Sequence, residues 1–175
     1  WQPSNEGHSY FFVMTNSDKQ SYALDLNDPT EAEDFTKLVA SADILIENLK
    51  PGSLARRGFS RENLNQINPR LIYCAISGFG TDSAYGQRPA FDTVVQAMSG
   101  FMDANIHDGM PMKAGISVGD LMGGEVGLFA VLAALHGRRQ SGLGAYVDLS
   151  MQDVAAWVTA PAWNNDIEDA STMVA

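Results

Sequence analysis

One carboxylate stands out by its surroundings. Asp120 lies between Gly119 and Gly123, at the start of a long apolar run. A carboxylate among apolar side chains is unfavourable unless it accepts hydrogen bonds or takes part in chemistry. The run predicts a buried helix, whose N-terminal N–H groups and dipole suit an anionic Asp. Spacing alone favours Asp120 as a helix cap, and the alternative is a catalytic carboxylate.

A group of cations is the second candidate site. Four of the eleven lysines and arginines fall within twelve residues, just after a predicted strand: Lys50, Arg56, Arg57 and Arg61. Arginine forks match the geometry of phosphate, so this segment could hold a phosphorylated ligand. The alternative is a solvated charged surface. Lys19, after a predicted turn at residues 16–18, is a weaker candidate for a phosphate contact.

Other chemistries find little support in the sequence. The three histidines lack metal-ligand spacing, so we expect no metal site. Cys74 is the single cysteine and lies in an apolar run, which excludes a disulfide and fits a buried thiol in a reduced, cytoplasmic setting. Residues 78–80 (GFG) lack the third glycine of a dinucleotide fingerprint. Gly123 and Gly124 fall inside the predicted helix, which indicates close packing against a helix or a ligand.

Alternating strands and helices must position these groups. Apolar runs predict strands at 42–47, 70–76 and 146–149, separated by helix-sized gaps. This favours an α/β domain with a mainly parallel sheet. Residues 10–15 are strand-like or the end of a loop, and residues 21–26 alternate as a strand does. Ligands of such sheets sit beyond the C-terminal strand ends, which directs attention to the loops 47–52 and 77–80.

Caps and periodicity predict the helices. Asp28 and Pro29 begin a helix whose buried stripe holds residues 35, 38 and 39, and Ser60 begins one that ends before Pro69. Ser150 begins the last helix, and residues 105–112 are an irregular connection. Residues 91–102 are helical by period, with four side chains facing inward: Val94, Val95, Met98 and Met102.

Length and charge restrict the function. The chain has 175 residues with 45% apolar content, enough for one domain with a real core. A net charge of −10 disfavours nucleic acid and anionic membranes as partners. Glu125 interrupts the longest apolar run, so we expect no membrane span. The chain begins at Trp1 without a signal-peptide pattern, and we expect it to be a piece of a longer protein.

Several motifs, in one order, resemble the family III coenzyme A transferases, which include formyl-CoA and carnitine-CoA transferases. Residues 47–52 (ENLKPG), followed by Arg56 and Gly58, are similar to the family's E-N-F-x-P-G…R-x-G. Residues 68–73 (NPRLIY) and 77–80 (SGFG) match family motifs, and Asp92 with residues 96–100 (QAMSG) matches D-x-x-x-Q-A-x-S-G. Gly119-Asp120 matches the G-D that carries the nucleophile, and residues 148–153 (DLSMQD) resemble the stretch that follows. The resemblance covers residues 11 to 163.

The resemblance implies a Rossmann-like α/β fold within a two-domain protein. Residues 1–163 would form part of the large domain, and residues 164–175 a polar tail or the start of a linker. It further implies a homodimer whose subunits interlock. The substrates would be an acyl-CoA and a small carboxylic acid, with coenzyme A handled as a thioester and no metal.

The resemblance also implies a mechanism. Asp120 attacks the thioester carbonyl, and the released CoA thiolate converts the mixed anhydride into an aspartyl-CoA thioester, which then passes CoA to the acceptor acid. Asn48, Leu49 and Arg56 would line the CoA site, with Arg56 on phosphate. The resemblance assigns Lys19 and Arg57 to the CoA site on weaker grounds.

Two alternatives remain open. The family includes racemases of 2-methylacyl-CoA, which place a histidine just before the position of Asp92. Phe91 stands there in this chain, and a phenyl ring cannot exchange a proton, so racemisation ranks below transfer. The other alternative is a non-catalytic domain that binds CoA or a nucleotide.

Overall fold

The computed structural model describes residues 4–5 and 7–163, so the predicted tail at 164–175 lies outside the described residues. The chain divides into two compact units, Trp1–Phe35 and Thr36–Ala175. The first unit contains the hairpin of β1 (Ser4–Asn5) and β2 (His8–Ser9), followed by helix α1 (Tyr10–Asn16).

Helix α1 shows that the strand predicted at residues 10–15 is wrong. The Ser9 cap favours the helix, because its hydroxyl accepts from the Phe12 N–H at 3.4 Å and so satisfies a free donor of the first turn. The strand predicted at 21–26 is also wrong. That segment is irregular and runs into a turn, where the Asp25 carboxylate accepts from the Asn27 N–H at 2.9 Å.

Helix α2 (Pro29–Ser41) begins where the sequence predicts. The Asp28 carboxylate accepts from the N–H of Thr30 at 2.8 Å and of Glu31 at 3.3 Å, which satisfies two free donors of the first turn. Val39 is buried as expected, whereas Leu38 is exposed.

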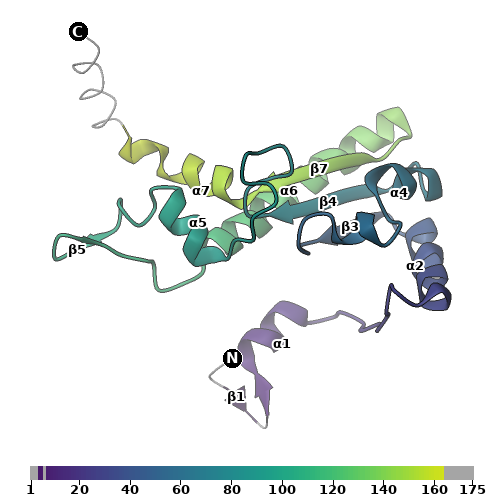
Figure 1. The fold of residues 1–175 in the computed structure, drawn as a ribbon, viewed down its shortest axis with the longest axis horizontal. Coiled ribbons are helices and arrows are strands. Elements are labelled where there is room, and N and C mark those ends of the chain that lie inside the picture. Colours follow the sequence, from purple (N-terminus) through teal and green to yellow (C-terminus); the bar gives the residue numbers. More distant parts are fainter. Residues whose placement is uncertain (1–3, 6, 164–175) are drawn as a thin grey trace. The chain divides into compact units, whose positions relative to one another are not determined.

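Three parallel strands form the sheet of the second unit (Figure 1). They are β3 (Ile44–Glu47), β4 (Ile72–Ser77) and β7 (Ala145–Ser150), with β4 in the centre. Ile44 pairs with Ile72, which pairs with Ala145 on its other side. Because β4 is covered on both faces, it is apolar along most of its length. The predicted α/β class and parallel sheet are confirmed.

The helices of this unit are α3 (Ser53–Arg56), α4 (Arg61–Ile67), α5 (Asp92–Met98), α6 (Val118–Ser141) and α7 (Met151–Thr159), which continues into a 3₁₀ turn, Ala160–Ala162. The predicted caps are confirmed. The Ser60 hydroxyl accepts from the Asn63 N–H at 3.3 Å, and the Ser150 hydroxyl accepts from the Asp153 N–H at 3.2 Å.

Helix α5 is shorter than predicted, and its burial differs. Val95 is buried, but Val94 and Met98 are exposed, and Gln96 is buried instead. The segment after α5 also departs from prediction, because residues 105–112 contain a hairpin of β5 (Ile106–His107) and β6 (Met110–Pro111). Its turn residues, Asp108 and Gly109, both have positive φ, as an Asp-Gly hairpin turn requires.

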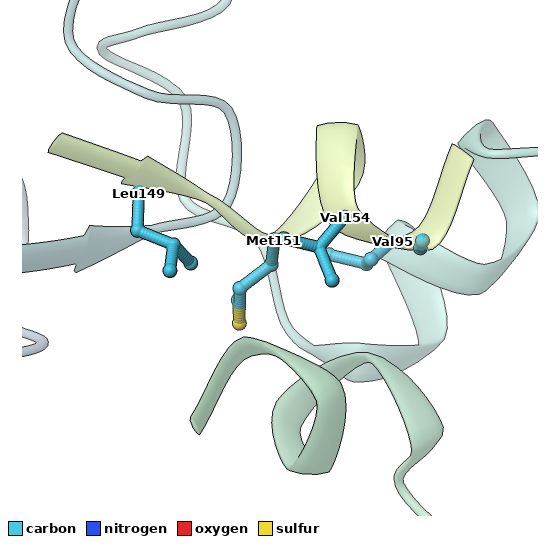
Figure 2. Packing of buried hydrophobic residues seen from close by; sticks show 5 residues of the cluster. Val95, Leu149, Met151 and Val154 are labelled. Carbon is cyan, nitrogen blue, oxygen red and sulfur yellow. The ribbon is translucent and has the colours of Figure 1, made fainter. Parts of the chain in front are cut away.

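Helix α6 packs on the sheet through glycines. Its buried residues recur every four positions: Gly119, Gly123, Gly127 and Val131. A Cβ on Gly123 would lie 3.1 Å from Cγ of Met151, and one on Gly127 would lie 3.3 Å from Cδ1 of Ile76. Figure 2 shows Met151 pointing toward α6, in the cluster that joins α5, β7 and α7. The predicted close packing against a helix is therefore confirmed at Gly123 but not at Gly124, where a Cβ would meet no atom of the described residues within 4 Å.

The opposite face of α6 is exposed at Leu128, Phe129 and Leu132, so the prediction of a fully buried helix is wrong. By length and composition α6 could cross a membrane, because an 18-residue stretch of it has a mean hydropathy of 1.6. This corrects the expectation that no segment is apolar enough. One such helix is weak evidence for a membrane protein, because core helices of soluble proteins share these properties.

Candidate active site

A cavity of about 480 Å³ opens at the C-terminal ends of β3 and β4. Its walls are residues 48–51 after β3, 76–78 at the end of β4, 88–91 before α5, and Asp120 and Gly124 of α6, with Met151 at the start of α7. Ligands of parallel sheets bind at this edge. The structure therefore brings together the two loops and the carboxylate that the sequence predicted.

Close backbone contacts hold the loops of this cavity together. A Cβ on Gly78 would lie 2.3 Å from Cβ of Ala90, so only glycine permits the loop after β4 to meet the segment before α5. The Asn48 amide donates to the carbonyl of Ile76 at 2.6 Å. The carbonyl of Gly78 accepts from the Gln152 N–H at 3.0 Å, which anchors the same loop to α7.

Asp120 is the third residue of α6, and Ser117 occupies the N-cap position. The simpler interpretation of Asp120 as the helix cap is therefore wrong. Its carboxylate accepts no hydrogen bond from any residue that the structure describes. Burial raises the pKa of this carboxyl, the Asp92 carboxylate raises it further, and Lys113 opposes both effects. Asp120 thus presents free carboxylate oxygens to the cavity.

The residues predicted to bind CoA fall into two groups. Asn48 and Leu49 line the cavity with Asp120. Arg56, the last residue of α3, and Arg57, which caps that helix, lie outside the lining and fold back on their own loop. Arg56 donates to the Pro51 carbonyl at 3.3 Å and to the Ser53 hydroxyl at 3.2 Å, and Arg57 donates to the Ser53 carbonyl at 3.0 Å.

Lys19 belongs to the first unit, where its ammonium donates to the Asn16 side chain at 3.4 Å. Among the described residues, the cations that line the cavity are Lys50 and Arg88, both of the second unit. Lys50 belongs to the predicted cation group, but sequence reasoning missed Arg88. The Arg88 guanidinium lies 4.7 Å from the centre of the Tyr85 ring. The only feature of the sequence that could have pointed to Arg88 is its position in the loop just before the predicted helix at 91–102.

The described residues show no metal site and no candidate nucleophile besides Asp120. Within residues 4–5 and 7–163, no three His, Cys, Asp or Glu side chains cluster in a way that could hold a metal ion. Cys74 is a free, buried thiol on β4, and burial raises its pKa, so it is a poor nucleophile.

Comparison with known proteins gives a consistent result. A family model described as CoA-transferase family III matches residues 1–174. The chain is 44% identical over 147 residues to acetyl-CoA:oxalate CoA-transferase of Acetobacter aceti, covering 83% of this chain and 38% of that protein. It is 40% identical over 151 residues to succinate–glutarate CoA-transferase of Agrobacterium fabrum, covering 86% and 38%. The chain thus spans about two fifths of the length of these relatives.

Solved structures agree with the sequence comparison. A CAIB/BAIF family protein from Brucella suis superposes with a TM-score of 0.77 at 35% identity, covering 83% of this chain and 39% of that one. Rv3272 from M. tuberculosis superposes with a TM-score of 0.80 at 30% identity, covering 86% and 42%.

Proposed function

The chain belongs to CoA-transferase family III, and from that premise we propose that the intact protein moves coenzyme A from an acyl-CoA to a carboxylic acid, with Asp120 as nucleophile. The observation that carries the proposal is the position of Asp120. It lies at the start of a helix, its carboxylate oxygens accept nothing from the described residues, and it lines a cavity at the sheet edge where ligands bind.

The proposed chemistry needs only the carboxylate. Asp120 attacks the thioester carbonyl, the C–S bond breaks, and a mixed anhydride and CoA thiolate form. The thiolate attacks the aspartyl carbonyl and displaces the donor acid, which leaves an aspartyl-CoA thioester. The acceptor carboxylate then displaces the thiolate, and the thiolate takes the acceptor acyl group from Asp120. No proton is gained or lost over the cycle, so the site needs no separate general base.

The cavity offers groups that could bind the CoA part of the substrate. Lys50 and Arg88 provide positive charge for the CoA phosphates, and Asn48 and Leu49 complete that side of the wall. Arg56 remains a candidate for phosphate, and its bonds to residues 51 and 53 also shape the loop that carries Lys50. Arg57 and Lys19 remain weaker candidates.

One feature of the lining favours transfer over racemisation of a 2-methylacyl-CoA. Phe91 lines the same cavity as Asp120, with 81% of its surface exposed, and its ring cannot exchange a proton. Gly124, one turn after Asp120, leaves open space beside the carboxylate, which is compatible with either reaction.

The proposal extends to the whole protein. Residues 1–163 would form part of the large domain and residues 164–175 a polar tail or the start of a linker, in a protein that functions as a cytoplasmic homodimer. The exposed apolar face of α6 (Leu128, Phe129 and Leu132) supports burial against another part of the assembly. The free thiol of Cys74 supports a reducing compartment.

Trapping the intermediate tests this proposal. Full-length protein is incubated with acetyl-CoA, succinyl-CoA or formyl-CoA, treated with hydroxylamine, digested, and analysed by mass spectrometry. We expect a hydroxamate on Asp120 that depends on the acyl-CoA. Asp120→Asn is expected to abolish both the adduct and CoA transfer to oxalate, glutarate or mesaconate, acids that occur in the names of relatives.

The control is Asp103→Asn, which removes the same charge from an exposed loop and should leave the adduct unchanged. Measurable CoA binding with no adduct and no transfer from any donor would refute the covalent mechanism. That outcome would favour the alternative of a non-catalytic CoA-binding domain.

A further inference from the structure

We infer that Asp92, Gln96 and Lys113 form a positioning network that holds the N-terminus of α6 and thereby orients the Asp120 carboxylate. The inference rests on the proposed function, because it assigns these residues a role in the same reaction. None of the three lines the cavity, so they would act through Asp120 rather than on the substrate.

Asp92 supplies the cap that α6 lacks locally. Among the described residues, Ser117 at the N-cap position makes no side-chain bond to the helix. Instead, Oδ1 of Asp92, a buried carboxylate on α5, accepts from the N–H of Gly119 at 2.8 Å. The acceptor comes from 27 residues earlier in the chain, so it ties α6 to α5 as well as satisfying a free donor.

Gln96 connects that carboxylate to the segment that leads into α6. Its side chain is fully buried, and its amide donates to Oδ2 of Asp92 at 2.8 Å and to the carbonyl of Ile116 at 3.2 Å. Its carbonyl oxygen accepts from the N–H of Ala114 at 2.9 Å. A buried amide with both ends bonded holds its partners in one arrangement, because breaking any of these bonds leaves a buried polar group unpaired.

Lys113 balances the charge of the network. Its ammonium lies 3.2 Å from Oδ2 of Asp92 and donates to the carbonyl of Ala114 at 3.1 Å. A carboxylate as buried as Asp92 is strongly unfavourable without a cation or several hydrogen bonds. Lys113, the Gly119 N–H and the Gln96 amide together stabilise the charged Asp92 side chain.

The geometry leaves little freedom at Gly119, the residue before Asp120. A Cβ there would lie 3.0 Å from Cγ1 of Val95 and 3.2 Å from Oδ1 of Asp92, so the α6 backbone rests directly on α5. A displacement of this contact would carry Asp120 with it. Displacements of about 1 Å in a reacting group lower rates by about a hundredfold.

The network also sets the charge environment of Asp120. Its pKa is raised by burial and by Asp92 and is lowered by Lys113. Lys50 and Arg88, from the loops after β3 and before α5, are the other charged residues of the described cavity lining. Substitutions of Asp92 and Lys113 should therefore move the ionisation of Asp120 in opposite directions.

Steady-state kinetics and pH profiles of the full-length protein test this inference with Asp92→Asn, Lys113→Met and Lys113→Arg. At the pH optimum, we expect kcat to fall at least about tenfold in Asp92→Asn and Lys113→Met, with KM for acyl-CoA within about twofold. The acid limb of kcat/KM should move to higher pH in Lys113→Met and to lower pH in Asp92→Asn. Lys113→Arg should restore most of kcat.

Asp103→Asn is the charge-matched control, and thermal melts show which variants fold. If Asp92→Asn does not fold, Lys113→Met and Lys113→Arg test the inference instead. The Lys113 side chain is 35% exposed, so its substitution disturbs the fold less. Suppose that the wild type transfers CoA normally. If the acid limbs of the variants then do not move, or if Lys113→Met keeps the wild-type kcat, the positioning role alone is overturned. A wild type that transfers no CoA would instead refute the proposed function, and this inference with it.

Discussion

Gly124 lies one helical turn after Asp120 on α6, and the two residues line the same cavity. A Cβ on Gly124 would meet no atom of the described residues within 4 Å, whereas one on Gly123 would lie 3.1 Å from Cγ of Met151. The two adjacent glycines therefore serve different purposes. Gly123 allows α6 to pack against α7, and Gly124 keeps space open beside the carboxylate.

This difference predicts opposite effects of substitution. Gly124→Ala should stabilise the protein by about 0.5–1 kcal/mol, because alanine favours helix and has room. Gly124→Leu should raise KM for longer acyl-CoAs at least about fivefold, with acetyl-CoA least affected. Gly123→Ala is the matched control: it should gain less stability because Met151 must move, and it should not discriminate by chain length. Equal effects at both positions would contradict this division of roles.

The raised pKa of Asp120 predicts a pH-dependent stability. The folded protein holds a proton on this carboxyl more tightly than the unfolded chain does. The free energy of unfolding therefore falls as pH rises through the interval between the two pKa values. Asp120→Asn removes this cost, so we expect its Tm to exceed that of the wild type by about 1–2 °C at pH 7–8. The gain should vanish below about pH 3.9, where wild-type Asp120 is protonated in both states. A gain that is constant from pH 3 to 8 would argue against this origin.

The cations of the cavity should control CoA affinity. We expect Lys50→Met and Arg88→Met each to raise KM for acyl-CoA about tenfold with little change in kcat, because each removes a positive charge from the cavity wall that we propose binds the CoA phosphates. The control is Arg139→Met, an exposed cation 19 residues beyond Asp120 on α6, or about 28 Å along the helix axis. An equal rise in KM for Arg139→Met would mean that net charge alone governs binding.

Arg138 should contribute stability without affecting activity. Its guanidinium donates to the Arg70 carbonyl at 2.9 Å, and it reaches the Asp43 carbonyl at 3.2 Å and the Asp43 carboxylate at 2.8 Å. These bonds tie the end of α6 to the residues that precede β3 and β4. Arg138→Met should lower the free energy of unfolding by about 2–3 kcal/mol in urea denaturation, because its side chain is only 11% exposed. Arg139→Met should change it by less than about 0.5 kcal/mol, and a similar loss in both would disprove the assignment.

Much of the fold could be predicted because its signals are local. The capping residues Asp28, Ser60 and Ser150 bond to N–H groups two or three positions away, so the sequence reports them directly. The parallel strands follow from apolar runs separated by helix-sized gaps. The strand predicted at 10–15 failed because a short apolar run does not distinguish a strand from a helix, and the Ser9 cap begins a helix there.

The sequence by itself determined the α/β class, the main strands and helix starts, and the position of Asp120 at the head of an apolar helix. Only the tertiary structure decided that Asp120 is not the cap, because the acceptor for the Gly119 N–H is Asp92, 27 residues away in the chain. It also decided which cations reach the cavity, since the contact between Gly78 and Ala90 brings the segment with Arg88 beside the loop after β4. Both results depend on contacts between distant residues, and neither spacing nor composition encodes such contacts.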